Sequence, residues 1–222
     1  MSVESTMKDA TRLRRAVMRL VTLVTLLAMP LLGPVGCMME LVAPEPSTLR
    51  EPAEVRITNF GMHAGLVLPR DEGNLGEYAF GEWEWFALEQ NQWYRSFGAL
   101  LIPSESPLSR RLRQDAAAHE ATSYAPRPIE VFLVEREKAL ALSRELDTLI
   151  TESMAATPDR AVMRDGTLFV PREEPYRLGN NCNHVLARWL ESLGVRVVGN
   201  RTVATVRVRP PRASDNTAQS PR

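Results

Sequence analysis

Short runs of alternating apolar and polar residues recur along the middle of the chain, and each is bounded by glycine, proline or asparagine. Such runs with turn residues on both sides are typical of strands that bury one face. We predict strands at residues 55–59, 64–68, 77–82, 129–134, 168–170 and 203–208. Residues 97–102 are compatible with a strand or a helical turn, and Asp165-Gly166 is typical of a turn.

Helical composition marks segment 106–122, and helical spacing of apolar residues marks segments 136–153 and 181–193. The last is the clearest, because Asn180 or Asn181 suits its N-cap and Gly194 suits the position after its C-terminus. Strands and helices are mixed without a repeating βαβ rhythm. The pattern therefore predicts an α+β fold with a largely antiparallel sheet packed with helices.

The N-terminal segment has a different pattern. Ala16–Val35 is apolar apart from Arg19, follows a basic stretch, and ends at a small residue, Gly36, just before Cys37. A basic region, an apolar region and a small residue at the cleavage position are the layout of a secretory signal. The uninterrupted apolar core, Leu20–Met29, is short for a membrane-spanning helix.

Cys37 directly after Val35-Gly36 resembles the lipobox of bacterial lipoproteins, although Pro34 stands where an aliphatic residue is usual. The resemblance implies cleavage before Cys37 and lipidation of that residue. An uncleaved N-terminal anchor and an ordinary cleaved signal are the alternatives. All three predict a domain outside the cytoplasm, in the bacterial cell envelope, and the first two hold it at the periplasmic or extracytoplasmic face of a membrane.

Composition and length suggest one folded domain with flanking segments. We predict a signal or anchor at residues 1–37, a flexible Pro-rich tether at 38–53, the domain at 54–208, and a disordered tail at 209–222. The 27 basic residues balance the 27 acidic ones, so the net charge gives no indication of nucleic-acid binding. Nothing in the sequence indicates an oligomeric state.

Cys182 begins the clearest helix. A thiol at a helix N-terminus lies at the positive end of the helix dipole, beside free backbone N–H groups. Both favour the thiolate, and the same N–H groups could stabilise an oxyanion. A small buried hydrophobic residue is the simpler interpretation of an isolated cysteine. The chain has one other cysteine, Cys37, so one disulfide is also compatible with export.

Three histidines could act beside this thiol. His63 follows a predicted strand and a glycine, and it is our candidate base for Cys182. His184 lies two residues after Cys182 and should point elsewhere on the helix, which suggests a structural role. His119 lies in a charged segment and should be solvated.

An aromatic segment follows the third predicted strand. Trp83 and Trp85 are either core residues or the wall of a substrate groove, and together with Asn181 they are our candidate substrate-binding residues. Glu82 and Glu84 are candidates for the carboxylate that holds the histidine in its productive tautomer, although such carboxylates are commonly just solvated. No metal-ligand spacing, phosphate loop or G-x-S-x-G motif is present, so no metal or cofactor is expected.

Three stretches together resemble a known group of proteins: GMHAGLVLP at 61–69, YAFGEWEWF at 78–86, and the segment 168–197 that contains NNCNHV. They are similar to an uncharacterised family of bacterial exported proteins with a G-W-H-T-G-L-V-L strand, an F-G-W-G-D strand and a terminal C-N-T-W-T-A helix. The order of His first and Cys last also resembles circularly permuted papain-like (NlpC type) proteins, including lecithin retinol acyltransferase. The likeness covers roughly residues 54–200.

The resemblance implies that Cys182 is the nucleophile and His63 its partner. It departs from the family at Met62 and at Glu82, where tryptophan is usual, and the family's acidic residue falls near Glu84. The expected function is a cysteine hydrolase that cleaves an amide or ester, with a cell-wall peptide favoured as substrate. A lipid acyltransferase or thioesterase, and a non-catalytic binding lipoprotein, are the alternatives.

Overall fold

The computed structural model describes residues 39–59, 63–90, 102–121, 130–202 and 206–210, apart from the side chains of residues 119–121. All of them lie in the second of the two units into which the chain divides, Cys37–Arg222. The predicted signal segment and Cys37 lie outside the described residues. Among the described helices, none is long and apolar enough to cross a membrane.

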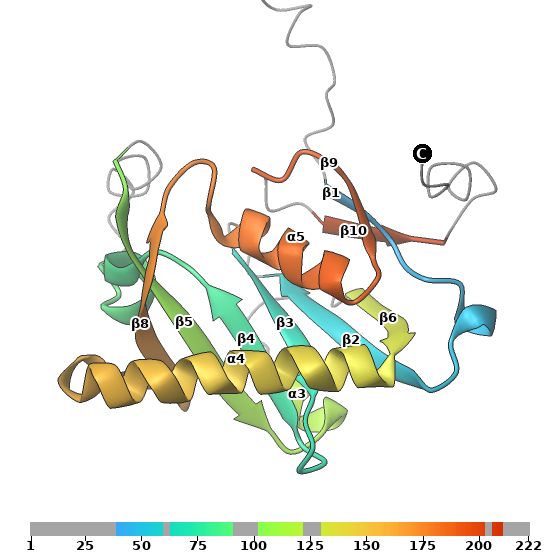
Figure 1. Ribbon diagram of the computed structural model, residues 1–222, viewed down its shortest axis with the longest axis horizontal. Helices are drawn as coiled ribbons and strands as arrows, with labels where there is room; N and C mark the ends of the chain where they lie inside the picture. Colours follow the sequence, from blue (N-terminus) through green and yellow to red (C-terminus); the bar gives the residue numbers. More distant parts are fainter. Residues whose placement is uncertain (1–38, 60–62, 91–101, 122–129, 203–205, 211–222) are drawn as a thin grey trace, which may run out of the picture. The chain divides into compact units, whose positions relative to one another are not determined.

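A seven-stranded antiparallel sheet forms the centre of this unit (Figure 1). Its strand order is β6-β2-β3-β4-β5-β8-β7, and neighbouring strands pair antiparallel throughout. The strands are β2 (Pro52–Asn59), β3 (Ala64–Pro69), β4 (Leu75–Phe80), β5 (Ser104–Arg113), β6 (Glu130–Glu135), β7 (Val162–Arg164) and β8 (Thr167–Tyr176). The predicted α+β class with a largely antiparallel sheet is therefore confirmed.

Two helices, α4 (Arg136–Ala156) and α5 (Cys182–Ser192), cover one face of this sheet (Figure 1). Both predicted helices are confirmed. Asn181 is the N-cap of α5, and Gly194 follows its end with a positive φ of 86°, where glycine is favoured. The core between helices and sheet contains Leu66, Tyr78, Leu108, Leu146 and Leu186.

The opposite face of the sheet carries the alternate residues of each strand. Val67 pairs with Glu77, Glu77 with Arg111, and Arg111 with Thr167, so these four side chains form one row across β3, β4, β5 and β8. Side chains of neighbouring residues in a strand point to opposite faces. This row therefore lies on the side away from α4 and α5.

The predicted tether is wrong where it meets the domain. Met39–Val42 forms β1, the central strand of a three-stranded sheet with β9 (Arg196–Gly199) and β10 (Val206–Arg209). Alternation in the short sequence MELV buries Met39 and Leu41 completely. Proline-rich composition a few residues later hid this strand, and β10 extends one residue into the predicted tail.

The prediction of a helix over residues 106–122 is also wrong for its first half. Residues 104–113 form β5, and only Ala116–Ala121 is helical, as α3. Arginine and leucine favour helices as isolated residues, but pairing with β4 and β8 on both sides overrides that weak preference. Three strands, β1, β7 and β9, had no counterpart in the prediction.

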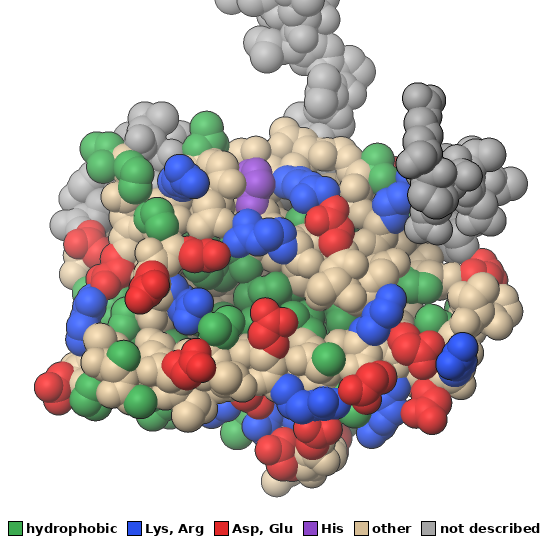
Figure 2. Space-filling model, viewed as in Figure 1, with side chains coloured by type: hydrophobic (Ala, Val, Ile, Leu, Met, Phe, Trp, Pro, Cys, Tyr) green, Lys and Arg blue, Asp and Glu red, His purple; other side chains and the backbone are tan. Residues whose placement is uncertain are grey.

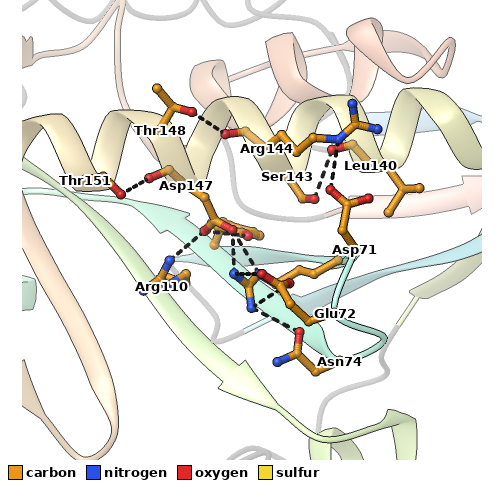
Figure 3. Close-up of polar contacts among 12 residues, drawn as sticks. Asp71, Glu72, Asn74, Arg110, Leu140, Ser143, Arg144, Asp147, Thr148 and Thr151 are labelled. Carbon is orange, nitrogen blue, oxygen red and sulfur yellow. Dashed lines mark hydrogen bonds and ion pairs between the residues drawn. The ribbon is translucent and has the colours of Figure 1, made fainter.

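An ion-pair network fixes α4 to the sheet (Figure 3). Asp147 of α4 accepts hydrogen bonds from Arg70 Nε at 2.9 Å, Arg110 Nη1 at 2.8 Å and the Tyr78 hydroxyl at 3.0 Å. These partners come from the end of β3, from β5 and from β4. One carboxylate on a helix thus ties together three adjacent strands beneath it.

Candidate functional site

Cys182 is the first residue of α5, and the local sequence explains its position. The Asn181 Oδ1 accepts hydrogen bonds from the backbone N–H groups of Asn183 at 3.1 Å and His184 at 3.2 Å, which starts the helix. Cys182 is buried, with 5% of the residue exposed. The helix N-terminus predicted from the sequence is therefore confirmed around this residue.

Two opposing effects act on the Cys182 thiol. Burial is the larger and raises its pKa above the usual range, whereas hydrogen bonds from the Tyr176 hydroxyl and from the backbone N–H groups of Asn183 and Cys182 lower it. The net pKa is raised, which opposes our expectation that the helix N-terminus favours the thiolate. A nucleophilic Cys182 therefore needs a base that removes its proton when substrate is bound.

Tyr176 is a residue that the sequence analysis missed. It ends β8, and its hydroxyl lies 3.9 Å from the Cys182 Sγ. Its ring stacks on Phe80, the last residue of β4, with ring centroids 6.2 Å apart. Burial raises the pKa of Tyr176, so its hydroxyl stays a donor. Tyr176 stands six residues before Cys182, across the turn in which Arg177 and Asn180 pair, but no motif in the sequence signals the contact.

His63 lies just before β3 and is 9% exposed. Its ring packs against Phe86, with centroids 4.0 Å apart. Burial lowers the pKa of His63 to about 4, and the nearby Glu77 carboxylate acts in the opposite direction. The imidazole is therefore neutral at neutral pH, and burial makes it a weaker proton acceptor than an exposed histidine.

A cavity of about 570 Å³ opens beside His63. Its walls include Phe80, Phe86 and Phe169, and its polar lining includes Glu77 and Arg111. A concave, largely apolar site with a few polar groups is typical of ligand-binding sites. The sequence analysis placed the groove at the tryptophans, whereas the aromatic lining here is phenylalanine.

His63 and Cys182 lie toward the same end of the large sheet, but Cys182 begins a helix on one face (Figure 1) and the cavity that His63 lines opens mainly on the other. β3 begins beside the end of β4, where Phe80 pairs with Leu108 of β5. Phe80 contacts the environments of both residues, because it stacks on Tyr176, the neighbour of Cys182, and also lines the His63 cavity. The direct contact between thiol and imidazole that catalysis requires stays a prediction.

The other acidic and aromatic candidates have contacts of their own. Glu82 Oε2 accepts a hydrogen bond from the backbone N–H of Trp85 at 2.7 Å and caps the short helix η2 (Trp83–Ala87). Glu84 is exposed. Trp83 is buried beneath the guanidinium of Arg160, which lies 5.4 Å from the ring centroid, and Trp85 is half-buried.

The carboxylate that acts on His63 in the structure is that of Glu77. The sequence did carry a signal for it. In the hairpin formed by β3 and β4, Glu77 alternates with the core residue Tyr78, which places it on the opposite face of the sheet. His63 lies on that face as well, since both residues line one cavity.

Asn181 and His184 interact with each other. The Asn181 Oδ1 lies 2.9 Å from His184 Nδ1 in addition to capping the helix. His184 is half-buried and its pKa is lowered, mainly by burial and then by Arg188 and Arg201. A structural role for His184 agrees with these contacts, and substrate binding by Asn181 stays a prediction.

Within the part of the chain that the structure describes, no group of three or more His, Cys, Asp or Glu side chains is arranged to hold a metal ion. The side chain of His119 lies outside the described part.

Comparison with known proteins gives no assignment. No family model, no curated protein and no solved structure matches the chain.

Proposed function

We propose that the chain is a cysteine hydrolase or acyltransferase that acts on an amide or ester bond, with Cys182 as nucleophile and His63 as its base. The proposal rests on the environment of the Cys182 thiol. It lies at the N-terminus of α5, within reach of backbone N–H groups of the first turn and 3.9 Å from the Tyr176 hydroxyl. Donors that converge on the sulfur stabilise its thiolate form. The same groups can stabilise the oxyanion that develops on the carbonyl oxygen of the substrate.

In the proposed reaction, His63 takes the proton of Cys182 as the Sγ attacks the carbonyl carbon of the substrate. The carbonyl oxygen becomes an oxyanion, which the N–H groups at the start of α5 and the Tyr176 hydroxyl stabilise. Protonated His63 then gives its proton to the departing amine or alcohol, leaving a thioester on Cys182. Water, or an acceptor alcohol or amine, attacks this thioester with His63 again as base, which restores the thiol.

A circularly permuted papain-like architecture is part of the proposal. It is supported by the order of His63 before Cys182, by the antiparallel sheet, and by the helix that carries the cysteine at its first residue. A cell-wall peptide is the favoured substrate and an acyl lipid the alternative. Lipidation of Cys37 would hold the domain at the bacterial envelope, where both are present.

Acyl-enzyme trapping tests the proposal without knowledge of the natural substrate. The Cys37→Ser chain, in which Cys182 is the sole cysteine, is treated with p-nitrophenyl acetate and its mass is measured intact. We expect one acetyl group on Cys182, formed at least tenfold more slowly in the His63→Ala variant. The matched control is His184→Ala, which alters another histidine near the thiol and should leave the rate unchanged. Equal rates for His63→Ala and the parent chain would refute the pairing.

A second candidate function is a ligand-binding module without catalysis. Two observations favour it: burial raises the pKa of Cys182, and a cavity of about 570 Å³ adjoins His63 on the face of the sheet away from the helices. Absence of any acyl-enzyme in the trapping experiment, combined with a folded chain, would favour this candidate over the enzyme.

A further inference from the structure

Glu77 lies on the same face of the sheet as His63. It pairs with Val67 of β3 and Arg111 of β5, on the face opposite Tyr78 and the helices. His63 and Glu77 both line the cavity, and both are buried, at 9% and 7% exposed. Buried carboxylates are uncommon unless they are paired or have a function.

Gly65 leaves room for the Glu77 side chain on the strand that follows His63. A Cβ on Gly65 would lie 3.4 Å from both Cγ and Oε1 of Glu77. The Glu77 side chain therefore lies directly over Gly65, which comes two residues after His63. A larger side chain at residue 65 would occupy the space that the Glu77 carboxylate fills.

Other charged groups surround this pair. Arg113 Nη2 lies 3.4 Å from Glu77 Oε2, and both side chains are less than one-tenth exposed. Arg111 and Glu89 line the same cavity, and Arg164 lies 3.5 Å from Glu89. The positive guanidinium of Arg113 thus lies beside the Glu77 carboxylate in a buried setting.

We propose that Glu77 is the positioning residue for His63: its carboxylate, reaching over Gly65, orients the imidazole and fixes which ring nitrogen carries the proton. It replaces Glu82 and Glu84 as the third member of the site. The catalytic meaning of this role rests on the proposed function. A carboxylate in this position also stabilises the imidazolium that forms when His63 accepts the thiol proton.

Nuclear magnetic resonance of the ¹⁵N-histidine-labelled full chain tests the proposal without a substrate. The chain has three histidines, and His63→Gln and His184→Gln variants assign their signals. We expect one dominant His63 tautomer at pH 7. Glu77→Gln should convert it to a mixture or to the other tautomer, and should lower the His63 titration midpoint by about one pH unit, a tenfold loss of proton affinity. Glu77→Asp should restore the tautomer in part.

Two further variants make the result decisive. Glu89→Gln removes an exposed carboxylate from the same cavity and should leave the His63 signals unchanged. If Glu77→Gln alone does not fold, Glu77→Gln with Arg113→Gln removes both charges of the buried pair and should still change the tautomer. An unchanged His63 tautomer in the Glu77 variants, or equal effects of Glu77→Gln and Glu89→Gln, would overturn the proposal.

The acyl-enzyme experiment separates this inference from the proposed function. If acylation of Cys182 fails while His63 responds to Glu77, the enzyme proposal fails and the positioning of His63 remains. If acylation requires His63 but its tautomer ignores Glu77, the positioning role alone fails.

Discussion

At the scale of single residues, Tyr176 and the first turn of α5 work against the burial of the Cys182 thiol. The tyrosine hydroxyl and the backbone N–H groups lower the pKa of the thiol, whereas burial raises it. Reactivity at Cys182 should therefore depend on Tyr176, although this residue lies on a different element. The effect is local and electrostatic, so it can be measured on the thiol itself.

Replacement of Tyr176 by phenylalanine should raise the pKa of Cys182, because it removes a hydrogen bond that favours the thiolate. In the Cys37→Ser background, we expect the alkylation rate by iodoacetamide at pH 8 to fall about threefold to tenfold. The control is His184→Gln, in the same first turn as Cys182 but bonded to Asn181. A rate unchanged by Tyr176→Phe would show that the hydroxyl does not reach the thiolate.

His63 makes stability depend on pH. Its pKa is lowered to about 4 in the folded chain, so the unfolded chain binds this proton more tightly. The stabilisation is fully present above the unfolded value near 6.5 and is lost as pH falls toward 4. We expect the free energy of unfolding to fall by about 2 kcal/mol between pH 7 and pH 5 through this residue.

Urea unfolding at the two pH values measures this loss. His63→Asn should reduce the pH dependence by that amount, whereas His184→Asn should retain most of it because it keeps His63. If the wild-type chain and His63→Asn lose equal stability between pH 7 and pH 5, the imidazole is not buried in its neutral form.

At the scale of elements, Asp147 fixes α4 to three strands (Figure 3). Burial alone would raise its pKa, but hydrogen bonds from Arg110, Arg70 and Tyr78 outweigh that effect, and the pKa is lowered. Asp147→Asn leaves two half-buried guanidinium groups without their shared carboxylate. We expect it to reduce the free energy of unfolding by about 2 to 3 kcal/mol.

Denaturant unfolding of Asp147→Asn beside Glu145→Gln measures this contribution, since Glu145 is an exposed carboxylate on the same helix. Glu145→Gln should change stability by less than about 0.5 kcal/mol. Because the folded pKa of Asp147 is lowered, its contribution is present above the unfolded pKa and fades as pH falls through the folded one. A similar loss in both variants would mean that the network does not hold α4.

The sequence was informative about elements with a strong pattern of their own. The helical spacing of α5, its Asn181 cap and its Gly194 terminus lie within fourteen consecutive positions, so they were predictable together. The strand β5 was not predictable in this way, because its arginines pair with carboxylates on other elements, such as Asp147. Local propensity does not reflect contacts with residues that lie far away in the sequence.

The same distinction holds for the candidate site. Cys182 and His63 could be proposed from their local setting, a helix start and a strand start. Tyr176 and Glu77 could not be singled out so easily, because each matters through a neighbour on another element. For Glu77, the alternation along β4 gave the face of the sheet, and the pairing of β3 with β4 was the missing step.

At the scale of the whole molecule, β1 changes how the domain relates to its proposed lipid anchor. Only Met38 separates Cys37 from a strand whose residues Met39 and Leu41 are completely buried. An extended residue spans about 3.5 Å, so a lipid on Cys37 would hold the domain within about 7 Å of the membrane surface. The expected tether of sixteen residues would have allowed a far longer reach.

The same strand makes a prediction about where the folded unit begins. A chain shortened to residues 38–222 keeps β1, whereas one shortened to residues 52–222 loses the central strand of the sheet β10-β1-β9. Removal of the buried Met39 and Leu41 side chains alone should cost about 3 to 6 kcal/mol. We therefore expect the shorter chain to unfold at much lower urea, with β9 and β10 exchanging their amide hydrogens rapidly. Replacing Glu40 by glutamine in the longer chain is the matched control: it removes the ion pair with Arg209 of β10 but keeps β1, and should cost less than about 1 kcal/mol. If both shortened chains unfold at the same urea concentration, β1 contributes nothing to the core, and the folded unit begins at β2.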